Sequence, residues 1–173
     1  MKRLPPAFFA RDATEVAPDL LNKVLLVGDV AARIIEVEAY THDDPASHSF
    51  RGRTKRNEAM YGPPGHLYVY FVYGMHYCVN IVTGLEGDAQ AVLIRAVVCD
   101  AVDPRLTNGP AKLCRQLGID MSMNGDRAHV VDDGISPSTT PVVTPRIGIT
   151  KAVEWPRRWL VADRGPLPSC GQP

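Results

Sequence analysis

Apolar and polar residues alternate along four segments of the chain, and a period of two is typical of β-strands. The four segments are 32–40, 67–72, 76–82 and 89–98. Gly74 allows a tight turn after the second segment, and the stretch 84–88 is expected to turn before the fourth. Because strands that follow one another through short turns run in opposite directions, we expect a largely antiparallel sheet.

The first predicted strand, 32–40, carries charges within an apolar pattern. Strict alternation places Ile35, Val37 and Ala39 on one of its faces. The other face then carries Ile34, Glu36, Glu38 and Tyr40. This strand therefore presents two carboxylates and a phenol on the same side of the sheet.

Helices are fewer than strands in this pattern. The stretch 19–24 is consistent with one short helix, and 111–117 predicts another. The second has Asn108 as a cap residue, Pro110 in its first turn and Gly118 at its end.

A loop rich in Ser, Thr and Pro is predicted at about 134–145, followed by a short strand at 147–149. The sequence contains no repeat and no linker that would divide it, and its 173 residues are enough for one core. We therefore expect a single domain over 1–173, of the α+β class, compact around a curved, largely antiparallel sheet with a few helices.

Charge is balanced over the whole chain, with 19 Lys and Arg against 19 Asp and Glu. The molecule thus has no overall positive field to attract a polyanion. A basic run is hidden in this balance: Arg51, Arg53, Lys55 and Arg56. Most such runs are solvated loops, but this one could also bind phosphates.

The cysteines and the N-terminus bear on the compartment. Cys78, Cys99, Cys114 and Cys170 lie far apart without zinc-site spacing, which favours reduced thiols. Residues 1–10 are basic and then apolar, but two prolines interrupt them, and no stretch of the chain is long and apolar enough to cross a bilayer. We expect a cytoplasmic protein.

Three charged residues stand inside apolar strands: Glu36, Glu38 and Arg95. A buried charge without a partner is strongly disfavoured, so Arg95 is expected to face one of the two glutamates. This pair could be purely structural, or it could belong to a site that carries out chemistry.

Aromatic side chains near these charges favour a flat ligand. Tyr40 shares a strand face with Glu38, His48 follows soon after, and Tyr68, Tyr70, Tyr73 and Tyr77 lie in one predicted hairpin. Aromatic rings stack on bases and attract cations. Tyrosine also fills sheets for its own sake, which suffices for Tyr68 and Tyr77. Tyr73 differs, because it stands at the hairpin tip, where it could wedge into a base stack.

Two other classes of protein compete with an enzyme that acts on a base. A metal-dependent hydrolase would use the donors Glu36, Glu38, His42, Asp43, Asp44 and His48, but their spacing matches no familiar site. A DNA-binding module without catalysis would use the tyrosines and the basic run, and the neutral overall charge argues against it.

Motifs over most of the chain resemble the alkyladenine (3-methyladenine) DNA glycosylases of animals and bacteria. The segments that carry the resemblance are 33–40 (Arg-Ile-Ile-Glu-Val-Glu-Ala-Tyr), His48 with Arg56, Asn57 and Met60, 65–80, 91–96, 108–114 and 145–149, in the order of the family. Two departures occur: the chain is shorter than animal members between His48 and Arg56, and position 76 is His where animal members have a phenol.

The resemblance implies a hydrolase that flips an alkylated or deaminated purine (3-methyladenine, 7-methylguanine or hypoxanthine) out of duplex DNA and cuts its N-glycosidic bond. Because no lysine is placed to form a Schiff base with the sugar, we expect a monofunctional enzyme that leaves an abasic site. Glu38 would be the general base, and Arg95 with the backbone of Ile147 would help to hold the water. The base-binding residues would be Tyr40 and Tyr70, which stack on its faces, with His48, Asn80, Ala39 and Leu93. The DNA-binding residues would be Tyr73, Met75, Arg56, Arg53, Ile147 and Gly148.

The resemblance also implies no cofactor and no metal. The partner would be double-stranded DNA with a damaged purine, bound by a monomer in the bacterial cytoplasm or nucleoid. Lys112 is the one lysine weighed as a Schiff-base former, and a solvated helix lysine is the simpler interpretation.

Overall fold

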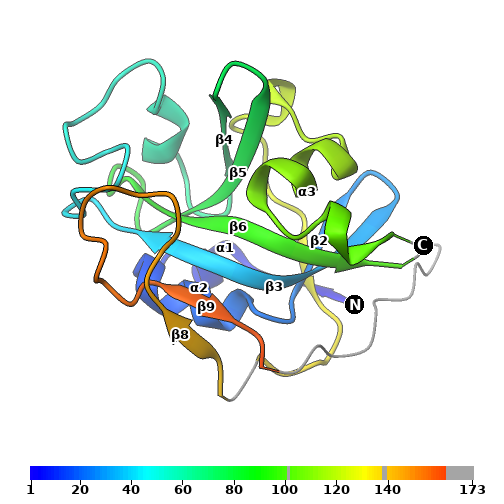
Figure 1. The fold of residues 1–173 in the computed structure, drawn as a ribbon. Coiled ribbons are helices and arrows are strands. Elements are labelled where there is room, and N and C mark those ends of the chain that lie inside the picture. The colour runs from blue at the N-terminus through cyan, green and yellow to red at the C-terminus, as the bar shows by residue number, and fades with distance from the viewer. Residues whose placement is uncertain (101, 138–139, 163–173) are drawn as a thin grey trace.

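Strand β3 (Val30–Tyr40) lies at the centre of the sheet in the computed structural model, which describes residues 1–100, 102–137 and 140–162 (Figure 1). One edge of β3 pairs with β6 (Gln90–Cys99). The other edge pairs first with β2 (Val24–Val27) and further along with β9 (Arg158–Leu160). An eleven-residue strand can hold two partners on one edge because each partner covers only part of its length.

Every strand pair in the described part of the chain is antiparallel. The order across the sheet is β1 (Lys2–Arg3), β7 (Val130–Asp132), β2, β3, β6, β5 (His76–Thr83) and β4 (Leu67–Val72), with β8 (Val142–Thr144) attached to β9. The predicted α+β class with a large antiparallel sheet is confirmed. The four strands predicted from alternation match β3, β4, β5 and β6 to within two residues at each end.

A bulge in β3 places two of its residues on faces other than those predicted. The pairing with β6 shifts on both sides of Glu36, so the alternation breaks there. Ile34 lies in the main core with Val37 and Ala39, whereas Ile35 packs on the other face against Ala96 and Val98. The prediction was wrong for Ile34 and Ile35 because an extra residue in one strand reverses the alternation beyond it.

Helix α2 (Ala13–Leu20) replaces the helix predicted at 19–24, which is wrong. Asp12 caps it by accepting a hydrogen bond from the Thr14 N–H at 2.8 Å. Beyond the helix the backbone becomes extended, and the apolar run Val24–Val27 forms β2. A short helix, α1 (Pro6–Phe9), precedes α2 and buries Phe9 in the core.

Helix α3 (Pro110–Leu117) confirms the second predicted helix, but its cap differs. The N-cap position is Gly109, with no side-chain cap, and the Asn108 side chain accepts a hydrogen bond from Lys112 Nζ at 2.8 Å instead. Gly118 ends the helix with φ of +69°, a left-handed conformation that glycine adopts without strain. Three short 3₁₀ turns complete the described helices: η1 (Glu58–Tyr61), η2 (Pro104–Leu106) and η3 (Met121–Met123).

The predictions for 134–149 need two corrections. The predicted loop 134–145 contains β8, which pairs with β9. Residues 138–139 of this loop lie outside the described part of the chain. The segment 147–149 is not a strand, because it turns at Gly148 (φ +80°) and its Ile147 N–H bonds to a side chain rather than to a neighbouring strand.

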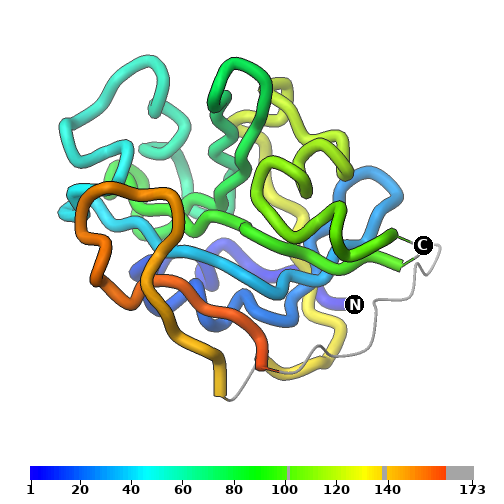
Figure 2. The backbone as a smooth tube through the Cα atoms, viewed as in Figure 1, coloured from blue at the N-terminus to red at the C-terminus, as the bar shows by residue number. Residues whose placement is uncertain are grey.

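The two longest described helices pack on different parts of the sheet, α2 against β3 and α3 against β5 and β6 (Figure 1). The backbone tube shows two long loops, 41–66 and 145–157, on the same side of the molecule near the C-terminal end of β3 (Figure 2).

Within the described residues, the longest helices have eight residues, so none could span a membrane. Cys78, Cys99 and Cys114 are buried, and Cys170 lies outside the described residues.

Candidate active site

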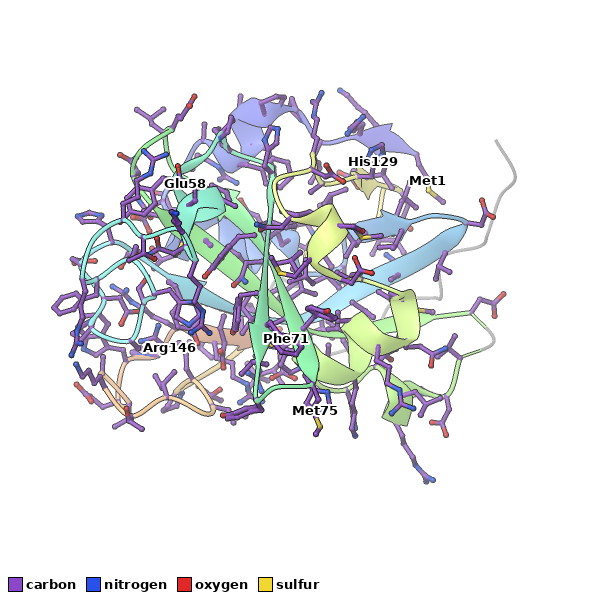
Figure 3. The ribbon with its side chains drawn as sticks, turned by 90° about the horizontal axis from the view of Figure 1, so that it is seen from above. Met1, Glu58, Phe71, Met75, His129 and Arg146 are labelled. Carbon is purple, nitrogen blue, oxygen red and sulfur yellow. The ribbon has the colours of Figure 1, made fainter. Side chains whose placement is uncertain are left out.

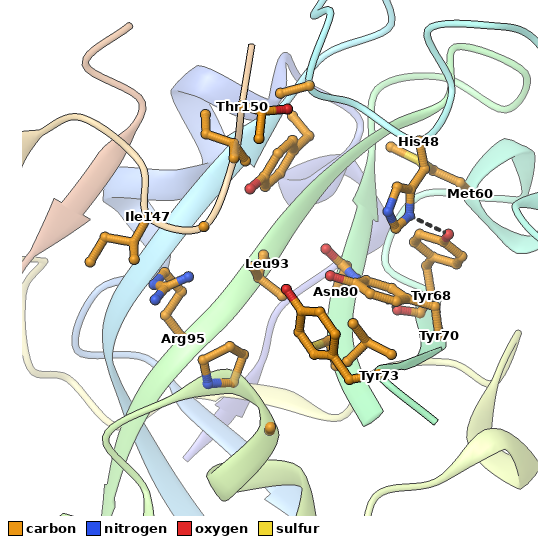
Figure 4. A pocket seen from close by; sticks show the side chains of 18 of the residues that line it. His48, Met60, Tyr68, Tyr70, Tyr73, Asn80, Leu93, Arg95, Ile147 and Thr150 are labelled. Atoms are coloured by element: carbon orange, nitrogen blue, oxygen red, sulfur yellow. Dashed lines mark hydrogen bonds between the residues drawn. The ribbon is translucent and has the colours of Figure 1, made fainter. Parts of the chain in front are cut away.

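A cavity of about 530 Å³ opens on the sheet beside the β4–β5 hairpin. Strands β3 to β6, the N-terminus of α3 and the loops 41–66 and 145–157 surround it (Figure 4). The residues predicted for the site that line it are Tyr40, His48, Arg56, Tyr70, Tyr73, Asn80, Leu93, Arg95, Ile147 and Gly148. The fold therefore brings most of the predicted residues to one place.

Strand register explains why these side chains meet. Glu38 of β3 pairs with Leu93 of β6, Leu93 pairs with Asn80 of β5, and Asn80 pairs with Tyr68 of β4. Residues paired across neighbouring strands point to the same face of a sheet. A row of side chains therefore runs from Glu38 to Tyr68 across four strands, and the cavity lies on this row.

Glu38 lies directly beneath the cavity wall, and its side chain has no exposed surface. Its Oε1 accepts a hydrogen bond from the Ile147 N–H at 2.9 Å and lies 3.3 Å from Arg95 Nη1. Its Oε2 accepts a hydrogen bond from the Tyr40 hydroxyl at 2.9 Å. These donors stabilise a buried carboxylate that would otherwise be costly. Arg95 and Ile147 thus contact Glu38 itself, in addition to any part they have in holding water.

Tyr40 stands between Glu38 and a buried cation. The Arg146 guanidinium lies 4.6 Å from the centre of the Tyr40 ring. Burial raises the pKa of the Tyr40 phenol well above its ordinary value, and the charge of Glu38 raises it further. Tyr40 therefore keeps its proton and remains a hydrogen-bond donor to Glu38.

Arg146 and Asp44 form a fully buried ion pair that no sequence pattern predicted. Arg146 Nη2 donates to Asp44 Oδ1 at 3.0 Å, and Arg146 Nη1 donates to Asp44 and to the Ala39 carbonyl. Arg157 approaches the same carboxylate at 3.6 Å. The pair joins the loop after β3 to the segment that delivers the Ile147 N–H.

Three predicted site residues lie away from the cavity wall. The Ala39 side chain is buried in the main core on the opposite face of β3. Met75 is 70% exposed beside the hairpin tip. Arg53 is exposed and pairs with Glu58 at 2.5 Å. Figure 3 shows Met75 at the margin of the molecule and Arg146 inside the loop region.

His48 and two tyrosines form the aromatic wall of the cavity (Figure 4). His48 Nδ1 is 2.8 Å from the Tyr68 hydroxyl, and the His48 ring meets the Tyr70 ring edge to face at 4.6 Å. Desolvation, together with the charge of Arg56, lowers the pKa of His48, so the ring is neutral at neutral pH. Burial raises the pKa of Tyr68 to about 12. Sheet filling alone was the interpretation of Tyr68 in the sequence, but its side chain also lines the cavity.

Tyr73 occupies the tip of the β4–β5 hairpin and is 85% exposed. Its φ of +53° is unusual for a bulky residue and costs conformational energy. The ring is too exposed for packing against the core to offset this cost, so it is available to a partner molecule.

The loop that carries the basic run is organised by Asn57, which is buried. Asn57 Nδ2 donates to the carbonyls of His48 at 2.9 Å and Gly52 at 3.0 Å, and its Oδ1 accepts from the Thr54 N–H. Arg56 Nη2 reaches the Phe71 carbonyl of the hairpin at 3.3 Å. Only Arg56 of the basic run reaches the cavity wall.

Sequence reasoning missed several other lining residues: Pro45, Ala46, Met60, Tyr68, Val72, Cys78, Pro110, Ala111, Ile149, Thr150 and Lys151. Five of the eleven come from loops, which carry no periodic pattern, and the others come from η1, β4, β5 and α3, so only the fold reveals that they share a site.

Four of the six donors that a metal-dependent hydrolase would use are engaged elsewhere. Glu36 and Glu38 face Arg95, Asp44 pairs with Arg146, and Asp43 accepts a hydrogen bond from Thr41. No group of three or more His, Cys, Asp or Glu able to hold a metal ion occurs in 1–100, 102–137 and 140–162.

Comparison with known proteins gives a consistent family. The family described as Methylpurine-DNA glycosylase (MPG) matches residues 7–165. A protein of Burkholderia cenocepacia is 47% identical over 91% of this chain and 87% of its own length, and one of Methanoculleus marisnigri is 46% identical over 91% and 94%. A protein of Carboxydothermus hydrogenoformans is 45% identical over 92% of this chain and 95% of its own length.

Each of the three relatives bears a name that assigns it provisionally to 3-methyladenine DNA glycosylase. The family match covers nearly the whole described chain, including Tyr40, Arg95 and Ile147, which contact Glu38. The chain therefore belongs to the methylpurine-DNA glycosylase family and is an enzyme of the DNA glycosylase class, a hydrolase of N-glycosyl bonds.

Proposed function

We propose that this DNA repair glycosylase excises an alkylated or deaminated purine from duplex DNA by flipping the base into the 530 Å³ cavity and hydrolysing its N-glycosidic bond with water activated by Glu38. The observation that carries the proposal is a buried carboxylate, held by Arg95, Ile147 and Tyr40, directly beneath an aromatic cavity.

The cavity suits a flat, electron-poor ring. Its volume lies within the usual range for small-ligand pockets, and Tyr40 and Tyr70 both line it. Arg146 covers one face of the Tyr40 ring, which leaves the other face for stacking. Alkylation of a ring nitrogen makes a purine cationic, which strengthens its attraction to these rings and makes it a better leaving group.

Glu38 would act at the sugar. As the base departs, the sugar gains oxocarbenium character, and a nearby carboxylate stabilises it while accepting a proton from water. A carboxylate oxygen can accept two hydrogen bonds, and Oε2 has one described partner, Tyr40, which leaves capacity for that water. Arg95 and the Ile147 N–H would hold the carboxylate in place while it reacts.

Tyr73 would fill the gap that the flipped base leaves in the duplex. We expect Tyr73→Ala to slow base release from a paired lesion about 10- to 100-fold, since a stacked aromatic ring is worth roughly 1–3 kcal/mol. The loss should be much smaller for a single-stranded substrate, which needs no extrusion. Single-turnover rates on both substrates check this, with Leu85→Ala, another exposed apolar residue in a turn, as control. Equal losses on both substrates would contradict the wedge.

The function is tested by incubating the protein with methylated duplex DNA in excess EDTA and identifying the released bases by chromatography. We expect free methylated purines and an unbroken strand. Inhibition by EDTA would favour a metal-dependent hydrolase, and binding without release would favour a non-catalytic module. A strand broken without heat or alkali would contradict a monofunctional reaction and direct attention to Lys151, which lines the cavity, since Lys112 bonds to Asn108.

A further inference from the structure

Arg95 contacts two carboxylates, those of Glu38 and Glu36, and Glu36 has no assigned role. Arg95 Nε donates to Glu36 Oε1 at 2.9 Å, while Arg95 Nη1 lies 3.3 Å from Glu38 Oε1. The same Glu36 oxygen accepts a hydrogen bond from Arg158 Nε at 2.6 Å. Arg158 Nη1 in turn donates to the Thr144 hydroxyl at 2.8 Å. A continuous chain of contacts thus leads from β8 through Arg158, Glu36 and Arg95 to Glu38.

The bulge and the C-terminal strand create this arrangement. The register of β3 and β6 passes from the pair Glu36–Ala96 to the pair Val37–Ile94, so Arg95 has no partner of its own in the register. On the other edge of β3, Arg158 of β9 pairs with Glu38 in the register and its side chain reaches Glu36. All four charged side chains are buried or nearly so, with exposures between 0% and 16%.

We propose that Glu36 and Arg158 are positioning residues for the glycosylase reaction: together they hold Arg95 against Glu38 and balance the charge that Glu38 faces. The inference rests on the proposed role of Glu38. Neither side chain lines the cavity, and the contacts of both reach Glu38 through Arg95.

The charges around Glu38 determine what removal of either residue does. The groups around it are Arg95 from β6, Glu36 and Tyr40 from β3, Arg158 from β9, Cys78 from β5, and Arg146, which lies over the Tyr40 ring and is itself paired with Asp44. The charges of the two glutamates and two arginines in the central network cancel. Loss of the negative charge of Glu36 strengthens the net stabilisation of the Glu38 carboxylate by its neighbours, and loss of the positive charge of Arg158 weakens it.

The test is the pH dependence of single-turnover base release from methylated duplex DNA, with the spontaneous rate subtracted. The acid limb of the profile, on which the rate falls as the pH falls, should move to lower pH in Glu36→Gln and to higher pH in Arg158→Gln. The expected shift is about half a unit to one unit each way for charges at this spacing in a partly screened site. The double variant should return the limb to that of the parent.

Opposite shifts that cancel are not produced by a merely structural role, which would lower stability without moving the limb. Arg158→Lys, which keeps the charge, should retain the parental limb. Arg11→Gln and Asp19→Asn make the same substitutions in an ion pair that lines no part of the cavity, and they should leave the profile unchanged. Circular dichroism and thermal melting confirm folding of every variant.

Coincident limbs for Arg158→Gln and the parent, or shifts in the same direction for both single variants, would overturn the inference. Failure of the proposed function is distinguishable, because Glu38→Gln would then release base as fast as the parent. If Glu38→Gln is slow while the limbs coincide, Glu38 stands as the base and only the roles of Glu36 and Arg158 are lost.

Discussion

Replacement of Glu38 by glutamine is expected to slow base release by about 10²–10⁴-fold under single-turnover conditions, the usual contribution of a general base. Glutamine has nearly the same shape and keeps an oxygen that can accept from the Ile147 N–H, so the cavity should persist. Binding to a lesion-containing duplex should therefore change little. A gel-shift titration and a quenched time course measure the two effects separately.

Glu15→Gln is a suitable control, because Glu15 is exposed in the first turn of α2 and lines no part of the cavity. It should match the parent in both measurements. A Glu38→Gln protein that releases base at the parental rate would remove Glu38 from the mechanism. Equal losses of binding and of rate would instead assign to Glu38 a role in forming the site.

The second large effect is expected on stability. Asp44→Ala leaves Arg146 charged and without its carboxylate at a position with no exposed side-chain surface. Breaking a buried pair by removing one partner typically costs about 3–5 kcal/mol, because the remaining charge is uncompensated. Urea unfolding followed by circular dichroism should show this loss in the free energy of unfolding.

The comparison is Asp19→Ala, which breaks the pair of Arg11 with Asp19. That pair is 36% and 42% exposed, and water screens it, so its loss should cost roughly 0–1 kcal/mol. Similar costs for the two substitutions would show that the Asp44–Arg146 pair contributes no more than a surface contact.

Regular strands were predictable because their signal is local. Alternation located β4, β5 and β6. The row of Asn80, Leu93 and Glu38 was not predicted, because it depends on the pairing of β3 with β6, which no short turn connects. The bulge at Glu36 was not predictable, since the residue that leaves the register depends on the partner strand. Helix α2 was missed because its cap, Asp12, stands further upstream than the apolar run suggested.

The chemistry of the site was only partly readable from the sequence. Charges inside apolar strands pointed to Glu36, Glu38 and Arg95, because a buried charge demands a partner. The Asp44–Arg146 pair left no such sign, since both residues lie in loops, where charges are ordinary. Only the docking of the 145–157 loop on the sheet brings them together.

The hydrogen bond from Ile147 to Glu38 spans 109 residues of sequence, and the Arg158 contact with Glu36 spans 122. During synthesis, the strand that bears the carboxylate therefore leaves the ribosome long before the segments that complete its surroundings. A nascent chain that ends before residue 147 has neither contact, so the surroundings of Glu38 are completed only after nearly all of the fold has been translated.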